Sequence, residues 1–323
     1  MSYFKRGLSK ELIKVLDDLA AEPGKNWWKE VLDSKKLLLA VRGGYLNAYA
    51  QGQSIFKIGA ENGTGLDAAG NPVISIHYKY LLEPDCPEKE YIRFTGKSFE
   101  IDPLTVICTK YKPDWTLPRL ITAASRYASE EKKGVHVIAR RNPTVVDLEI
   151  AFTQTGEAEE DAKALRIDLA ALHRDGAGKA KLVFYEAKRA DDKRLRAEPE
   201  REAEVVKQME RYDKFLHDHA ADLEKAYQDV CATLVKLCSR GSRALPDLIK
   251  EVGAEPSRKL SVDPVARLLV FGFDEDQKKG DIFRRHIEAL QNRLKRPVVA
   301  KGNPESFELV EDYKRFPPSA AGA

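Results

Sequence analysis

The sequence predicts an α/β (α+β) protein with a mixed β-sheet core flanked by helices, preceded by a separate β-rich N-terminal domain. Between residues 36 and 110, short apolar runs alternate with Gly, Asn and Pro turns, which is typical of β-strands. After residue 145, strand-like segments alternate with amphipathic helical ones, which favours a mixed sheet. A chain of 323 residues is long enough for two domains, predicted at residues 1–113 and 114–323.

The N-terminal domain is expected to begin with two short helices, at residues 8–21 and 26–33. Its glycine-rich segment at 59–65 lacks the Gly-Lys-Ser/Thr of a phosphate-binding loop and is interpreted as a hairpin loop. No family motif stands out in this domain, and substrate recognition is the role that we expect for it. Its strands are predicted at residues 37–41, 46–50, 54–58, 73–82, 91–94 and 105–109.

The second domain is expected to begin with a helical segment at residues 117–142 that is interrupted near Ser129. Residues 202–240 are predicted to form one long helix or a helical pair, and residues 241–262 resemble a linker. A second amphipathic helix is predicted at 282–294. The strands of this domain are predicted at residues 145–152, 165–173, 181–188, 267–273 and 297–300.

Two of these strands carry charged side chains that a hairpin would bring together. Asp168 lies on one strand, and Glu186 and Lys188 lie on the next, after a segment rich in turn formers. If the hairpin is symmetric about Ala177, Asp168 and Glu186 face each other with Cβ atoms about 4.5–5.5 Å apart. The two-residue period of a strand places Lys188 on the same face as Glu186. The sequence therefore predicts that two carboxylates and an amine converge.

These side chains suit metal-dependent hydrolysis of a phosphodiester. Two carboxylates at that distance repel each other unless a cation lies between them or one is protonated. Mg²⁺ prefers oxygen ligands and retains several waters, so one or two carboxylates and a substrate phosphate suffice to hold it. The metal activates its bound water, and a lysine stabilises the charge that develops on the phosphoryl group. A salt bridge on an exposed sheet face would use the same residue types, and the pattern alone leaves both interpretations open.

The segment 166–212 resembles the PD-(D/E)XK nuclease superfamily, which has the restriction-endonuclease-like fold. Asp168 and the later Glu186-Ala-Lys188 are similar to the motif that names the superfamily. Gln208-Met-Glu-Arg-Tyr212 resembles the QxxxY motif of the RecB-type branch. Gln208 and Tyr212 lie one helical turn apart, and the resemblance implies that they help to hold the substrate or the site. The resemblance covers about residues 118–300.

The resemblance also implies a metal site and a reaction. Asp168, Glu186 and the backbone carbonyl of Ala187 would bind Mg²⁺ or Mn²⁺. Lys188 would be the catalytic lysine, and the products would carry 5′-phosphates. Ile167 precedes Asp168, whereas the motif that names the superfamily has Pro before this Asp. Members with an apolar residue at this position are common.

The family usually adds an acidic residue from a preceding helix, and three carboxylates are candidates here. Glu130 and Glu131 open the second half of the first helical segment of the nuclease-like domain. Glu131 is favoured because it shares a helical stripe with apolar residues four and seven positions later. Glu149 competes, because it lies on the polar face of the strand at 145–152. A negatively charged helix start or a solvated sheet face would explain these residues without catalysis.

The composition fits this interpretation without proving it. A net charge of +3 is too small to indicate nucleic-acid binding, but residues 110–143 contain eight Lys or Arg against three acids, which suits phosphate contact. The sequence shows no signal peptide and no membrane segment, so a cytoplasmic location is expected. The cysteines show no CxxC spacing, which argues against zinc and favours a reducing compartment; they are Cys86, Cys108, Cys231 and Cys238.

The sequence thus predicts a metal-dependent phosphodiesterase that acts on nucleic acid, with DNA favoured over RNA. Whether it cuts at ends or internally, and its oligomeric state, do not follow from the sequence. The alternative is a catalytically silent nucleic-acid-binding subunit that retains the fold, against which the intact Asp168, Glu186 and Lys188 argue. DNA repair, mobile-element defence and restriction all use this fold, so that the pathway stays open.

Overall fold

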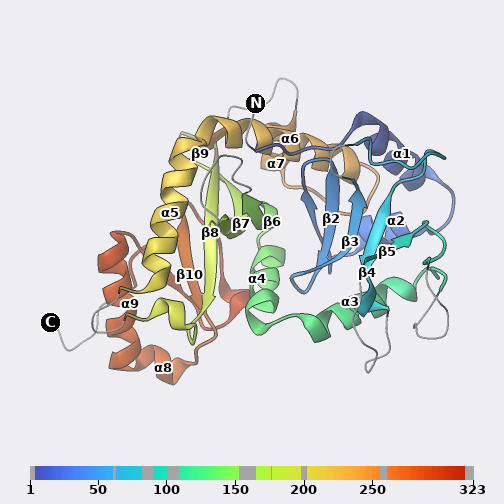
Figure 1. The fold of residues 1–323 in the computed structure, drawn as a ribbon. Coiled ribbons are helices and arrows are strands. Elements are labelled where there is room, and N and C mark those ends of the chain that lie inside the picture. Colours follow the sequence, from blue (N-terminus) through green and yellow to red (C-terminus); the bar gives the residue numbers. More distant parts are fainter. Residues whose placement is uncertain are drawn as a thin grey trace, which may run out of the picture. The chain divides into compact units, whose positions relative to one another are not determined.

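A computed structural model describes residues 4–60, 63–81, 91–100, 109–152, 165–175, 177–197, 202–254 and 260–316. Within these ranges the chain is a mixed α/β protein with two β-sheets, one antiparallel and one mixed (Figure 1). The predicted α/β class is confirmed at this level. Each sheet belongs to one compact unit: the antiparallel unit comprises residues 5–136 and 226–257, and the mixed-sheet unit comprises residues 1–4, 137–225 and 258–323.

The division between the units differs from the boundary predicted at residue 113. The antiparallel unit continues to His136 and includes a second stretch, residues 226–257, from the C-terminal half of the chain. Packing explains the difference. Helix α3 (Thr116–Tyr127) buries its apolar face, including Leu117 and Leu120, and contacts strands of the antiparallel sheet. Amphipathic spacing predicts that such a helix has an apolar face, but not which sheet covers it.

The antiparallel sheet follows the chain in order, strand by strand. Trp27 of α2 packs against Phe56 and Phe94 of the sheet, with ring centroids 6.0 and 5.8 Å away. This aromatic cluster forms the core of the unit with the helices α1 (Lys10–Ala21) and α2 (Trp27–Asp33). The strands are β1 (Leu38–Val41), β2 (Tyr45–Ala50), β3 (Gln53–Gly59), β4 (Ile74–His77) and β5 (Tyr91–Phe94).

Two predicted segments were wrong in detail. The strand predicted at 73–82 ends at His77, and a 3-10 turn, η1 (Tyr78–Tyr80), follows and buries Tyr80. The linker predicted at 241–262 contains helix α7 (Asp247–Gly253), too short for its period to be recognised in the sequence, and strand β9 (Leu260–Val262). Of the strand predicted at 105–109, residues 105–108 lie outside the described residues.

The mixed sheet has the order β11-β10-β8-β7-β6, with β9 beside the start of β8. Strands β6, β7 and β8 pair antiparallel, whereas β8, β10 and β11 pair parallel. Strand β8 is central and almost entirely buried, so charged residues within it require an explanation beyond surface solubility. The strands are β6 (Val145–Phe152), β7 (Leu165–Arg174), β8 (Ala180–Arg189), β10 (Arg267–Phe271) and β11 (Val298–Ala300).

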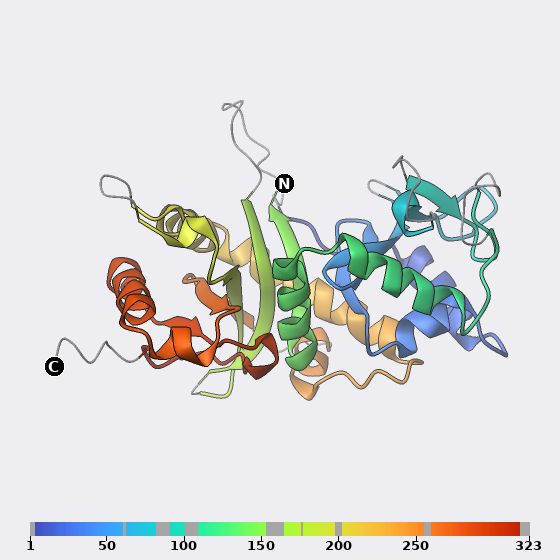
Figure 2. The ribbon, with the colours of Figure 1, turned by 90° about the horizontal axis from the view of Figure 1, so that it is seen from below.

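Helix α5 (Glu204–Asp218) covers the face of β8 on which Glu186 lies. It buries Val205, Met209, Tyr212 and Leu216, which recur every three or four residues as expected for one helix face. Helix α9 (Asp281–Leu294) packs against both α5 and β11 (Figures 1 and 2). Two further helices begin in one unit and end in the other, namely α4 (Glu130–Arg141) and α6 (Ala220–Cys238).

The predicted segment 202–240 is therefore a helical pair, α5 and α6, interrupted at His219. The short helix α8 (Glu275–Lys279) was not predicted; a capping box between Asp274 and Gln277 defines its start. None of the helices in the described ranges combines the length and apolarity needed to cross a lipid bilayer.

The opposite face of β8 is covered by the C-terminal segment. The Tyr185 hydroxyl donates to the carbonyl of Val310 at 3.2 Å and lies 2.7 Å from Nε2 of His173. Because successive strand residues point to opposite faces, Tyr185 faces this segment while Glu186 faces α5. The candidate site therefore lies on the helix-covered face of the mixed sheet.

Candidate functional site

The hairpin of β7 and β8 has the register that the sequence predicted. Leu169 pairs with Tyr185 and Arg174 with Ala180, so the hairpin is symmetric about Ala177. One further step along this register places Asp168 opposite Glu186. Here a side chain accepts the hydrogen bond from the neighbouring strand: Oδ2 of Asp168 accepts a bond from the backbone N–H of Ala187 at 2.8 Å.

Glu186 and Lys188 form a buried ion pair on β8. The Lys188 Nζ donates to Oε1 of Glu186, and its distance from the carbonyl oxygen of Ala187 is 3.4 Å. Both side chains are 2% exposed. A buried ion pair costs more to desolvate than an exposed one, so its presence in a central strand is weak evidence for a purely stabilising role.

Gln208 and Tyr212 of α5 also contact the Glu186 carboxylate. Nε2 of Gln208 donates to Glu186 Oε1 at 2.9 Å, and the Tyr212 hydroxyl lies 3.2 Å from Oε2. Tyr212 also donates to the backbone carbonyl of Arg166. The structure thus brings together five predicted site residues, with Gln208 and Tyr212 fixing the orientation of the Glu186 carboxylate.

The two carboxylates are held in conditions that disfavour their charged forms. Burial, and then the neighbouring charge of Asp168, raise the pKa of Glu186 to about 8, although Lys188 opposes the shift. Burial also raises the pKa of Asp168, and the charge of Glu149 adds to this rise, against the opposing effect of Lys188. Burial raises the pKa of the Tyr212 hydroxyl as well, with a further contribution from Glu186. Perturbed carboxylates of this kind cluster at functional sites.

Glu149 of β6 lies across from Asp168 of β7. Leu148 pairs with Leu169 and Ile150 with Ile167, which leaves Glu149 opposite Asp168. Glu149 has a φ of 51°, a left-handed conformation that is strained in a non-glycine residue. Such strain costs about 1–3 kcal/mol and is concentrated at functional sites.

The other two acidic candidates belong to the antiparallel unit. Glu130 and Glu131 form the first turn of α4, in the part of this helix that belongs to the antiparallel unit. Glu130 pairs with Lys133 at 2.8 Å. Within the mixed-sheet unit, Glu149 is the carboxylate whose charge raises the pKa of Asp168; the preference for Glu131 stays a prediction.

If the chain has the metal-dependent activity that the resemblance implies, we expect Glu149→Gln to weaken it about 10–100-fold, as is typical when a side chain that supports metal ligands is removed. Glu131→Gln, the matched variant of the competing candidate, is expected to leave activity within a factor of about three. Steady-state cleavage at several Mg²⁺ concentrations measures both variants. A larger loss in Glu131→Gln than in Glu149→Gln would show that Glu131 of α4, and not Glu149, is the additional acidic residue of the site.

Two residues near the site were not predicted. Arg194, in the 3-10 turn η3 (Lys193–Leu195), lowers the pKa of Asp168 through its charge. It is held by Asp192, with 2.5 Å between Nη2 and Oδ2. The signal in the sequence is a short charged run directly after the Glu-x-Lys strand, two acidic residues followed by two basic ones. A solvated turn would have the same composition.

The donor groups fit a hard divalent cation. Asp168 and Glu186 supply carboxylate oxygens, the preferred ligands of Mg²⁺ and Mn²⁺. Their pKa values are raised first by burial and then by neighbouring negative charge, and a bound cation would favour the charged forms. In the present arrangement Lys188 provides that compensation. Among the described residues, no group of three His, Cys, Asp or Glu side chains is already arranged around a metal position.

In the described residues, one residue of the predicted basic segment has a packing role, and two of the cysteines are buried. Arg119 stacks over the ring of Trp115 at 3.7 Å, so at least one of the basic residues has a packing role. Cys231 and Cys238 are buried free thiols, and burial raises the pKa of both. The remaining two cysteines lie outside the described residues.

Comparison with known proteins found no matching family model, no matching curated protein and no matching solved structure. The functional argument therefore depends on the residues of the site and on their geometry.

Proposed function

We propose that this chain is a divalent-metal-dependent nuclease that hydrolyses phosphodiester bonds of nucleic acid, with DNA favoured over RNA. The observation that carries the proposal is that Asp168 of β7 meets the buried pair of Glu186 and Lys188 near the carboxyl end of the central strand. Each buried ion costs several kcal/mol to desolvate, so apolar side chains of similar volume would often stabilise the fold as well as this ion pair does. Stability alone therefore does not explain the cluster.

The topology supports a restriction-endonuclease-like fold for the mixed-sheet unit. The antiparallel strands β6, β7 and β8 are followed by a helix, and the chain then returns to the sheet as β10 and β11, parallel to β8. The acidic and basic residues lie near the carboxyl end of β8. Ligands of open α/β sheets bind outside the carboxyl ends of parallel strands, so the position of the site agrees with the proposal.

The metal would be held by Asp168, Glu186 and the carbonyl oxygen of Ala187. When bound, it would polarise the phosphoryl oxygen and supply an activated water. Lys188 would then leave Glu186 and place its ammonium group against the phosphate, where positive charge stabilises the transition state. Gln208 and Tyr212 are positioning residues, since both bond to the Glu186 carboxylate and would keep it aligned.

Cleavage of labelled nucleic acids tests the proposal. Linear and circular single- and double-stranded DNA, and RNA, would be incubated with Mg²⁺, Mn²⁺ or EDTA, with Lys188→Ala beside the parent. The expected result is metal-dependent cutting that the variant loses, and the circular substrates separate internal cleavage from cleavage at ends. If no substrate is cut in either metal, or if the variant cuts as well as the parent, the catalytic assignment fails and the binding-subunit alternative takes its place.

A further inference from the structure

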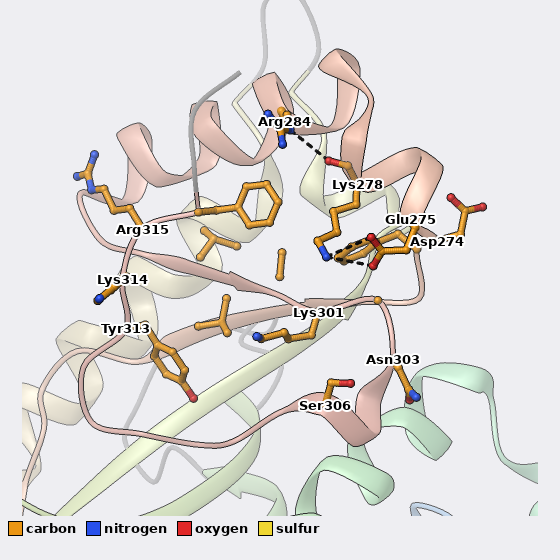
Figure 3. A pocket seen from close by; sticks show the side chains of 16 residues that line it. Asp274, Glu275, Lys278, Arg284, Lys301, Asn303, Ser306, Tyr313, Lys314 and Arg315 are labelled. Carbon is orange, nitrogen blue, oxygen red and sulfur yellow. Dashed lines mark hydrogen bonds and ion pairs between the residues drawn. The ribbon is translucent and has the colours of Figure 1, made fainter. Parts of the chain in front are cut away.

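A pocket of about 740 Å³ lies in the mixed-sheet unit, away from the residues of the candidate site. It is bounded by β11 and the following turn, by α8 and the start of α9, and by the C-terminal segment that includes Tyr313 and Phe316 (Figure 3). We call it the β11 pocket. Its residues have no role in the proposed metal site, so a function for the pocket has to be inferred from the side chains that line it.

The β11 pocket and the candidate site lie at the same end of the mixed sheet. Lys188 pairs with Val270 in β10, and Val270 pairs with Ala300 in β11, so the three residues form one row across parallel strands. Since neighbouring strands lie about 4.8 Å apart, the row spans about 10 Å. The pocket residues Lys301 and Gly302 directly follow this row.

The charged residues of the lining are five Lys or Arg against two acidic residues. Figure 3 shows Lys278 and Lys301 reaching toward the pocket from its two sides, whereas Lys314 and Arg315 extend away from it. Lys278 pairs with Glu275 at 3.0 Å. Lys301 is exposed and has no ionic partner among the residues that the structure describes. An accessible cation therefore faces this space.

Apolar and aromatic groups form the rest of the wall. Val298 and Val299 of the edge strand lie beside Phe273 and Phe316. Phe283 packs between these two phenylalanines, with ring centroids 4.4 Å from Phe273 and 6.1 Å from Phe316. An aromatic and apolar wall beside an unpaired ammonium group matches a nucleotide, whose base contacts aromatic rings while its phosphate contacts lysine.

We propose that the β11 pocket binds one nucleotide of the substrate strand, on the same strand as the bond that is cut. Its phosphate contacts Lys301, and its base lies against the wall formed by Phe273 and Phe316. At a rise of about 3.4 Å per nucleotide in a stacked strand, a separation of about 10 Å places this nucleotide about three positions from the scissile bond. The inference rests on the proposed nuclease function, which supplies the strand.

Binding of a fluorescent single-stranded oligonucleotide in EDTA tests this site independently of cleavage. Anisotropy titrations at several salt concentrations would compare the parent with Lys301→Ala. The matched control is Lys279→Ala, which removes an exposed lysine of α8 that does not line the pocket. We expect Lys301→Ala to weaken binding about 3–10-fold and to lower the salt slope by about 0.7, the loss of one phosphate contact in a single strand. Lys279→Ala is expected to bind like the parent.

A second arm locates the phosphate. Oligonucleotides with a single neutral methylphosphonate at successive positions would be titrated with the parent and with Lys301→Ala. We expect one position, about three nucleotides from the cut, to weaken binding to the parent but not to the variant. Equal sensitivity of both proteins at every position would overturn the pocket assignment.

The outcomes separate the two proposals. If the parent binds and cuts but Lys301→Ala matches it, the pocket assignment fails and the nuclease stands. If the parent binds without cutting and Lys301→Ala binds more weakly, the nuclease fails while the nucleotide site stands. If the parent binds only free nucleoside monophosphates, or no nucleic acid at all, the strand-binding role of the pocket is contradicted.

Discussion

Lys188→Met is expected to lower the rate of phosphodiester cleavage by about 10²–10³-fold, the usual loss when one group that stabilises the transition-state charge is removed. Methionine keeps the length and apolar stem of lysine, so the buried volume in β8 changes little. The fold should tolerate the change because Glu186, whose pKa is already raised to about 8, can take up a proton in place of its lost partner. Single-turnover cleavage at saturating Mg²⁺ measures the effect.

Lys181→Met is the matched control for this prediction. Lys181 lies on the same strand but forms its ion pair with Glu311, away from the site. We expect this variant to cleave at the parent rate. Comparable losses in both variants would show that a general loss of β8 stability, and not the chemistry of Lys188, explains the result.

Asp168→Asn is expected to abolish metal-dependent cleavage and, at the same time, to stabilise the folded protein at pH 8. Asp168 raises the pKa of Glu186 through its charge, so its neutral replacement lets Glu186 ionise at lower cost. The asparagine oxygen can still accept the bond from the Ala187 N–H. Each unit of relieved pKa shift contributes about 1.4 kcal/mol, and we expect a gain of about 1–2 kcal/mol in the free energy of unfolding.

The pH dependence of this gain has a definite sign. A carboxyl whose pKa is higher in the folded than in the unfolded state holds its proton more tightly when folded, so it favours folding at low pH and loses that effect as pH rises. For Glu186 the loss runs from the ordinary value of 4.5 to about 8. The stability difference between Asp168→Asn and the parent should therefore be small at pH 4.5 and grow up to about pH 8.

Urea denaturation of both proteins across this pH range provides the measurement. Glu210→Gln, which neutralises an exposed carboxylate on α5, should show the pH profile of the parent. A destabilised Asp168→Asn at pH 8 would mean that Asp168 serves mainly as an ionic partner of Lys188, which is the structural interpretation of the cluster.

The hairpin register was predictable because its determinants are local. The side chain of Asp175 accepts bonds from the backbone N–H groups of Ala177 and Lys179, and Gly178 adopts a φ of 75°. These are the turn residues that the sequence displays, and a two-residue strand period then aligns Asp168 with Glu186. The QxxxY spacing was informative for the same reason, since one helical turn relates Gln208 to Tyr212.

Features that depend on distant packing were not predictable. The β11 pocket combines the ends of two strands, two helices and the C-terminal segment, and no sequence period connects them. The helix α3 has a visible apolar face, but the sheet that accepts it is set by complementarity in three dimensions. The left-handed conformation of Glu149 likewise has no signal in a residue type that ordinarily avoids it.

Direct measurement of Mn²⁺ binding tests the central claim, that Asp168 and Glu186 form a divalent-metal site. Titration calorimetry at pH 8 would compare the parent with Asp168→Asn and with the control Glu210→Gln. We predict saturable binding of Mn²⁺ by the parent and the control, with a loss of at least about 10–100-fold in affinity in Asp168→Asn. No saturable binding by the parent, or the same affinity in Asp168→Asn, would contradict the metal site and with it the proposed mechanism.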